Sequence, residues 1–123
     1  MRVILLKVDI QDCIFCKIIS GEVPANIVLE NDSILAFEDI EPQAPVHILI
    51  IPKKHITSIN DIKFKDRDIC GDMLLAAKQI AKISNINNSG YRTIFNTNED
   101  GGQTVFHIHM HLLGGRKMKW PPG

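Results

Sequence analysis

The 123-residue sequence has no net charge, because its 14 Lys and Arg residues are balanced by 14 Asp and Glu residues. Proteins that bind nucleic acid or anionic membranes through charge carry a basic excess, so neither partner is expected. No apolar run is long enough to span a bilayer. The three cysteines are an odd number, which argues against a disulfide framework. These absences predict a globular protein of the cytoplasm, with the nucleus as a second compartment.

The first residues are briefly apolar but do not form a secretion signal. Lys7 and Asp9 interrupt the stretch, and no small-residue cleavage site follows it. We therefore expect residues 1–11 to be an N-terminal extension. Residues 12–123 have a length suited to one domain, and they contain neither an internal repeat nor a linker.

Apolar periodicity predicts an α+β domain. Period-two or continuous apolar runs indicate strands over residues 27–29, 34–37, 47–51, 91–96 and 107–113. A short helix is expected over residues 12–20, and a long one over residues 66–84. The long helix has an apolar stripe of Ile69, Met73, Ala76, Ala77, Ile80 and Ile83. The links are hairpin-like, so the prediction is a single antiparallel sheet of about five strands with one short and one long helix. The strand over 47–51 is apolar throughout and is expected at its centre.

Three histidines alternate with apolar residues near the C-terminus. In a strand, His107, His109 and His111 would share one face at spacings of roughly 6.6 Å. The intervening Ile108, Met110 and Leu112 would face the core. Imidazole serves near neutral pH as base, acid, nucleophile or metal ligand. A row of solvated strand histidines is the alternative, but the pattern favours a functional site.

The loop before the histidines contains two adjacent glycines, Gly101 and Gly102. Glycine lets main-chain N–H groups approach an anion, and Asn96, Gln103 and Thr104 add uncharged donors. A Gly-Gly pair is often only a turn, yet beside a histidine row it indicates a phosphate site. His109, in the middle of the row, would be the nucleophile if a partner held its Nδ1–H and left Nε2 free to attack.

Cys13 and Cys16 have the spacing of a zinc-binding pair. His55 and His107 could supply the remaining two ligands. Two unrelated thiols at the start of a helix are the alternative, while a redox role lacks the accompanying β-α-β pattern.

Taken together, these motifs resemble the histidine triad (HIT) family over residues 13–123. The alternating histidines are its signature. The similarity is greatest to the Hint branch, on four further segments: Phe37-Glu38-Asp39-Ile40, Pro42-Gln43-Ala44-Pro45, Ile51-Pro52-Lys53-Lys54-His55-Ile56 and Trp120-Pro121-Pro122-Gly123. Gly114-Gly115-Arg116 with the closing Trp-Pro-Pro-Gly separates this branch from the dinucleoside-polyphosphate hydrolases and uridylyltransferases.

The resemblance implies a homodimeric, purine nucleotide-binding phosphoramidase. Such enzymes hydrolyse adenosine or guanosine 5′-phosphoramidates to the nucleoside monophosphate and an amine through a nucleotidyl-histidine. The implied catalytic residues are the nucleophile His109, its support His47, the carbonyl of His107 that orients the ring, and His111 and Thr104 facing the phosphate and leaving amine. No organic cofactor is implied.

The resemblance also assigns the nucleotide contacts. Asp39 would bind the ribose hydroxyls, an apolar slot would hold the base, and Trp120 would reach the partner subunit's site. The implied nucleotide-binding residues are Ile14, Phe15, Ile18, Phe37, Asp39, Ile40, Asn96, Gly102, Gln103, Thr104, Val105, His109, His111 and Trp120. Bacterial relatives with both cysteines bind structural zinc with two histidines, which would make Cys13, Cys16, His55 and His107 the ligands.

One departure and two alternatives remain. Position 104 is Thr where many relatives have Ser, so the hydroxyl is kept on a stiffer side chain. A zinc-dependent hydrolase would use the histidines as metal ligands, although no acidic partner stands beside them in the sequence. A nucleotide-binding adaptor with little turnover would keep the pocket without the chemistry.

Overall fold

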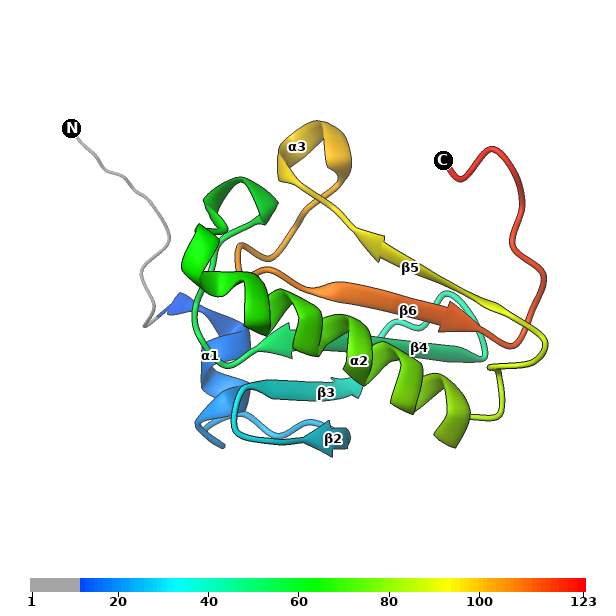
Figure 1. The fold of residues 1–123 in the computed structure, drawn as a ribbon, viewed down its shortest axis with the longest axis horizontal. Helices are drawn as coiled ribbons and strands as arrows, with labels where there is room; N and C mark the ends of the chain where they lie inside the picture. Colours follow the sequence, from blue (N-terminus) through cyan, green and yellow to red (C-terminus); the bar gives the residue numbers. More distant parts are fainter. Residues whose placement is uncertain (1–11) are drawn as a thin grey trace.

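Residues 12–123, which the computed structural model describes, build an antiparallel sheet with one long helix lying across it (Figure 1). The expected extension over residues 1–11 lies outside the described residues. The strands are β2 (Ile27–Glu30), β3 (Ile34–Glu38), β4 (Val46–Pro52), β5 (Tyr91–Phe95) and β6 (Met110–Gly114). Their order is β2-β3-β4-β6-β5, and every neighbouring pair is antiparallel. The predicted α+β class, the five-stranded sheet and the central position of β4 are confirmed.

The helices also match the prediction, with additions. They are α1 (Ile14–Ile19), α2 (Arg67–Ile83) and α3 (Asn98–Gly101), with 3-10 turns η2 (Ile59–Asp61) and η3 (Phe64–Asp66). The short α3 lies in the segment expected to be a loop before the histidines, and the two 3-10 turns lie between β4 and α2, with Asp66 of η3 at the predicted start of the long helix. The N-cap of α1 is Cys13, whose sulfur accepts the Cys16 N–H at 3.2 Å. The first helix therefore starts on the predicted metal-binding pair.

The alternation of side chains divides the core between the two faces of the sheet. On the α2 face lie Ile34, Ala36, Ile48 and Ile50, with Met73, Ala76, Ala77, Ile80 and Ala81 from the helix. On the α1 face lie Leu35, Phe37, Leu49 and Ile51, with Cys13 and Phe15. Ile83, predicted to be in the stripe, is 59% exposed. The buried Ile86, just beyond the helix, packs in the core instead.

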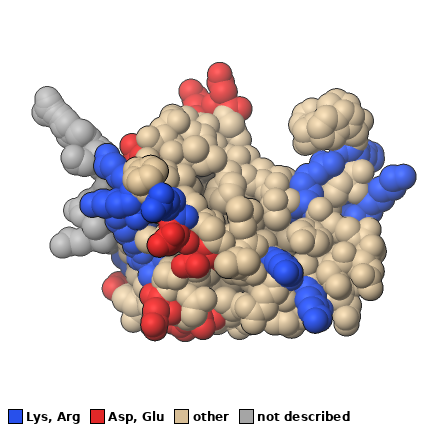
Figure 2. Space-filling model, in the orientation of Figure 1, with Lys and Arg blue, Asp and Glu red and all other residues tan. Residues whose placement is uncertain are grey.

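On the face drawn in Figure 2, acidic and basic side chains adjoin one another on the left and further basic side chains lie toward the right, with uncharged surface between the two groups. Leu74 and Leu75, on the outer side of α2, are 60% and 64% exposed. Within residues 12–123, no helix combines the length and the apolar composition that crossing a membrane requires. These two leucines lie among exposed charges of α2 such as Lys78 and Lys82, and packing of the core does not explain them.

Candidate active site

The three alternating histidines do not lie in one strand. Only His111 lies in β6, while His107 and His109 precede it in irregular chain. The rings of His109 and His111 stay together, with centroids 5.0 Å apart. The ring of His107 is fully buried and turns toward Cys13, 3.3 Å away. The predicted strand over residues 107–113 is therefore too long. The rings of His107 and His109 still lie on the same side of the sheet, because Phe15 contacts both, at 6.0 and 5.1 Å between centroids.

A main-chain contact explains why β6 begins only at Met110. The Ile108 N–H donates to the Ile56 carbonyl at 2.6 Å, beyond the end of β4, so regular pairing with β4 begins only at Met110. The intervening Ile108, Met110 and Leu112 are buried, as predicted. An irregular segment can present its alternate side chains to two different sites, and here it does.

Main-chain carbonyls determine which nitrogen of two histidines carries the proton. His109 Nδ1 lies 2.8 Å from the carbonyl oxygen of His107, which can only accept, so Nδ1 holds the hydrogen and Nε2 has a free lone pair. His107 Nε2 donates to the Pro52 carbonyl at 2.8 Å in the same way, which leaves its Nδ1 as the acceptor or ligand atom. Burial lowers the pKa of His109, opposed by this carbonyl and by Asp39. The imidazole is therefore neutral at pH 7 with Nε2 available.

A polar cluster of Asp39, His47 and His111 lies at the other end of the site. His47 Nε2 lies 2.9 Å from His111 Nδ1 and 3.4 Å from Asp39 Oδ2. The cluster forms because His47 pairs with Leu113 across β4 and β6, which puts it diagonally opposite His111 on the same face. Asp39 directly follows β3. Burial lowers the pKa of His47 below its ordinary value although Asp39 opposes this, so both rings of the cluster are neutral near pH 7.

Hydrogen-bond donors around His47 argue against a metal ion in this cluster. The three side chains offer ligand atoms within 4.8 Å of one another. However, the Gln43 main-chain N–H donates to His47 Nδ1 at 3.0 Å, so the neutral ring carries its hydrogen on Nε2. That nitrogen faces the other two side chains and cannot also ligate a metal. A catalytic metal here would need the opposite tautomer of His47.

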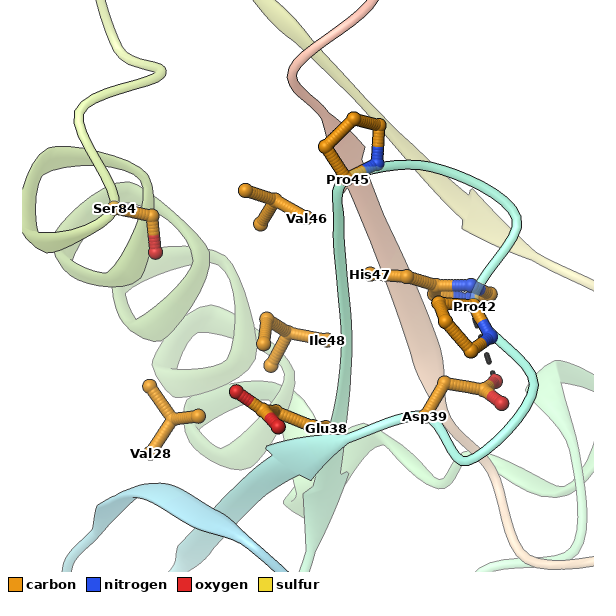
Figure 3. Close-up of a pocket in the computed structure, with 9 residues that line it drawn as sticks. All are labelled: Val28, Glu38, Asp39, Pro42, Pro45, Val46, His47, Ile48 and Ser84. Carbon is orange, nitrogen blue, oxygen red and sulfur yellow. Dashed lines mark ion pairs between the residues drawn. The ribbon is translucent and has the colours of Figure 1, made fainter.

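The same cluster borders a pocket of about 260 Å³ (Figure 3). Asp39 and His47 meet on one side of it, and Ser84 at the end of α2 lies on the other. The remaining lining residues are Val28, Glu38, Pro42, Pro45, Val46 and Ile48. The pocket is thus an opening beside the loop between β3 and β4, on the α2 side of the histidines.

Aromatic and aliphatic side chains of α1 and β3 form an apolar wall beside His109. The ring of Phe15 makes edge contacts with His109 at 5.1 Å and with Phe37 at 5.5 Å between centroids. Ile18 and Val105 pack partly buried against the same cluster. The wall therefore joins most of the residues predicted to bind the base.

Other predicted nucleotide contacts are more exposed. Ile14 is 41% exposed, beside a pocket of about 200 Å³ that is also lined by Thr104 and Val105. Ile40 and Trp120 are 96% and 82% exposed. Both project from loop or tail segments into solvent.

The side chain of Gln103 holds the predicted phosphate loop in place. Gln103 is buried, and its amide donates to the carbonyls of Thr57 at 2.8 Å and Val105 at 3.0 Å. Its Oε1 accepts the Asn98 N–H at 2.9 Å. Gly102 ends α3 with φ of +83°, a conformation that suits glycine. In this structure Gln103 orders the loop, while Thr104 is exposed, Asn96 is partly buried, and both remain available to a ligand.

Cys13, Cys16, His55 and His107 converge on one point. The contacts of Cys16 Sγ with His55 Nδ1 and of His107 Nδ1 with Cys13 Sγ are both 3.3 Å, and the two imidazole nitrogens are 3.2 Å apart. A tetrahedral zinc ion places its sulfur and nitrogen ligands roughly 3.4–3.8 Å from one another. Burial, with Cys13 adding to it, raises the pKa of Cys16 to about 12, a value that a bound cation would reverse. The donor set and spacing fit a closed, four-ligand zinc centre.

Comparison with known proteins shows the family to which this chain is related. A model of the HIT domain matches residues 20–118. The purine nucleoside phosphoramidase of Escherichia coli is 50% identical over 108 residues, which are 88% of this chain and 91% of that protein. The chain belongs to the HIT family.

Two solved HIT structures superimpose closely on this fold. A HIT family hydrolase from Legionella pneumophila is 56% identical with a TM-score of 0.89, over 90% of this chain and 99% of that one. A histidine triad protein from Clostridium difficile is 46% identical with a TM-score of 0.87, over 91% and 97% of the two chains. The fold of this HIT domain is thus shared over nearly its whole length.

Sequence reasoning missed the polar contacts of the loop between β3 and β4. The Gln43 N–H that reaches His47 is a main-chain group, and the Gln43 carbonyl is bound by Arg116 at 3.0–3.1 Å. Both residues lie in segments quoted for the family resemblance. Their side chains carried no signal for a contact between them.

His111 should make the stability of this HIT domain depend on pH. Burial chiefly, and then His109 and His47, lower the pKa of His111 from 6.5 to about 4, with Asp39 opposing. Between these two pKa values His111 is protonated in the unfolded chain but not in the folded chain. Its contribution to the free energy of unfolding is therefore complete above pH 6.5 and is lost as the pH falls toward 4. His111→Asn should give a shallower decline of Tm over this interval in circular dichroism melts. Equal slopes for variant and wild type would contradict the assignment.

Proposed function

We propose that the protein is a purine nucleoside phosphoramidase, which hydrolyses adenosine or guanosine 5′-phosphoramidates to the nucleoside monophosphate and an amine. The observation that carries the proposal is the His109 Nδ1–H bond to the His107 carbonyl, because it leaves the Nε2 lone pair free. The phosphoramidase from Escherichia coli, 50% identical, supports the substrate class. We place the protein in the cytoplasm.

The reaction has two displacements at phosphorus. His109 Nε2 attacks, the P–N bond breaks, and the amine leaves with a proton supplied on the side of His111 and Thr104. Water then attacks the phosphorus of the nucleotidyl-histidine, which releases the monophosphate and restores the imidazole. Phe15 and Phe37 would form the wall for the purine, with Ile14, Ile18, Ile40 and Val105 around it. Asn96 and the loop ending at Gly102 and Gln103 would border the phosphate.

Zinc is proposed as a structural ion held by Cys13, Cys16, His55 and His107. Four protein ligands leave no position for a reactive water, which is the usual difference between structural and catalytic zinc. When bound, the ion would stabilise the two thiolates and tie the start of α1 to His107. This closed donor set, with the His47 tautomer, disfavours the zinc-dependent hydrolase; no feature of the described residues specifically favours an adaptor.

We also propose that residues 12–123 form one domain that assembles as a homodimer. Among the described residues β5 is an edge of the sheet, and α2 presents Leu74 and Leu75 to solvent. An unpaired strand edge and exposed leucines on one side of a molecule suit an interface between two copies. Trp120 would then reach the partner's site, and sedimentation velocity would give the mass of the assembly.

Asp39 provides the test of nucleotide recognition. Its Oδ1 accepts the Glu41 N–H at 2.8 Å and its Oδ2 faces His47, so a carboxylate with four acceptor positions keeps capacity for ribose hydroxyls. We expect Asp39→Asn to raise KM for adenosine phosphoramidate by about tenfold, the value of one charge-assisted hydrogen bond. The 2′,3′-dideoxy analogue should be affected much less. Equal losses on both substrates would remove the ribose role, and absence of wild-type turnover would refute the phosphoramidase itself.

A further inference from the structure

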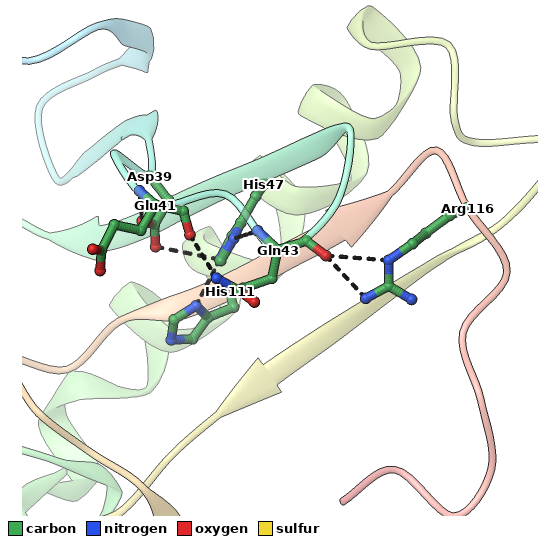
Figure 4. A network of polar contacts seen from close by, with 6 residues as sticks. All are labelled: Asp39, Glu41, Gln43, His47, His111 and Arg116. Atoms are coloured by element: carbon green, nitrogen blue, oxygen red, sulfur yellow. Dashed lines mark hydrogen bonds and ion pairs between the residues drawn. The ribbon is translucent and has the colours of Figure 1, made fainter.

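The loop between β3 and β4 is linked to the C-terminal tail through one arginine (Figure 4). Arg116 donates from Nε at 3.1 Å and from Nη2 at 3.0 Å to the carbonyl oxygen of Gln43. The N–H of the same residue, Gln43, donates to His47 Nδ1 at 3.0 Å. An exposed side chain of the tail is therefore two hydrogen bonds away from a buried histidine.

The close passage of the tail over the loop makes this contact possible. Gly115 has φ of +89°, and a Cβ built there would lie 2.8 Å from Pro45 Cβ. Only glycine lets the tail pass so near and places Arg116 beside Gln43. Two further contacts are internal to this loop: the Glu41 N–H donates to Asp39, and the Gln43 side chain donates to the Glu41 carbonyl. The start of the loop is tied to β4, because the Asp39 N–H donates to the His47 carbonyl at 3.0 Å, whereas the Gln43 carbonyl is held by Arg116.

The donor at His47 determines where the hydrogen lies on both His47 and His111. A donor at His47 Nδ1 requires the hydrogen of the neutral ring to be on Nε2. His47 Nε2–H then donates to His111 Nδ1, 2.9 Å away, so the hydrogen of His111 is on its own Nε2. His111 thereby presents a donor, not a lone pair, at its outer nitrogen. That is the form needed beside a leaving amine or a phosphate oxygen.

We propose that Arg116 is a positioning residue. By binding the Gln43 carbonyl it fixes the main chain on both sides of the Gln43 Cα, so that the Gln43 N–H selects the Nε2–H tautomer of His47 and, through it, the donor form of His111. The selection of the tautomer is a property of the free protein. Its consequence for turnover rests on the proposed phosphoramidase function.

The test measures the tautomer and the kinetics separately. Nitrogen-15 spectra of the imidazoles distinguish protonated from unprotonated ring nitrogens. In the wild type His47 should carry hydrogen on Nε2, and in Arg116→Met both tautomers should be populated. We expect kcat for adenosine phosphoramidate to fall by about fivefold, in keeping with one exposed charge-assisted hydrogen bond, with KM nearly unchanged. Arg116→Lys, which retains one donor, should restore part of the loss.

Arg92→Met is the matched control. Its guanidinium also binds a carbonyl of the tail, that of Lys119 at 2.9 Å, but does not touch the loop. It should leave the His47 spectrum as in the wild type. An unchanged His47 tautomer in Arg116→Met, or the same spectral change in Arg92→Met, would overturn the proposal. If the wild type has no turnover, the phosphoramidase function fails while the spectra still decide the role of Arg116.

Discussion

His109→Ala is expected to lower turnover of an adenosine phosphoramidate by at least about 10³-fold while nucleotide binding persists. The variant removes the Nε2 lone pair that we propose as the nucleophile but leaves the wall formed by Phe15 and Phe37 and the carboxylate of Asp39. The measurements are steady-state release of amine and titration with the nucleoside monophosphate. A variant with turnover near the wild-type rate would refute covalent catalysis by His109.

His109→Asn separates the chemistry from the packing. Its amide retains much of the ring volume and can still donate to the His107 carbonyl, but it has no nucleophilic nitrogen. We expect it to be as inactive as His109→Ala with a higher Tm. In the wild type, a denaturing quench at alkaline pH during turnover should trap nucleotide on the protein, because the P–N bond to an imidazole is stable there, and neither variant should retain it. Turnover that survives a chelator in a protein that circular dichroism shows to be folded would exclude a catalytic metal.

Cys13→Ser is expected to reduce zinc content from about one ion per chain to nearly none. Serine can keep the N-cap of α1, because its hydroxyl can accept the Cys16 N–H as the thiol does, so the variant tests the metal rather than the cap. The linked loss of stability should be roughly 3 kcal/mol, or about 10 °C in Tm. Elemental analysis of protein purified without added zinc and thermal melts give both values.

Cys70→Ser is the matched control for this experiment. Cys70 is the third cysteine, partly buried on α2 and outside the four-residue cluster. Its zinc content should equal that of the wild type. A wild-type zinc content near zero, or the same content in Cys13→Ser, would remove the structural metal from the proposal. Catalysis by His109 would be unaffected by that result.

The sequence alone was sufficient for the fold class, the order of the elements and the family. Alternation at period two marked the strands, and a stripe at three- and four-residue spacing marked α2, because burial of apolar side chains requires these periods. It failed at Ile83, where the core takes Ile86 from beyond the helix end. It also failed at His107, whose strand-like pattern lies in irregular chain.

The residue types of the candidate site were readable from the sequence, but their protonation was decided by the tertiary structure. The carbonyls of His107 and Pro52 and the N–H of Gln43 determine which nitrogen of His109, His107 and His47 holds a hydrogen. Every residue except proline carries the same main-chain donor and acceptor, so no residue letter reveals which group will face a ring. The sequence specified the imidazoles and thiols, and the folded main chain decided which nitrogen of each of these imidazoles is a donor and which has a free lone pair.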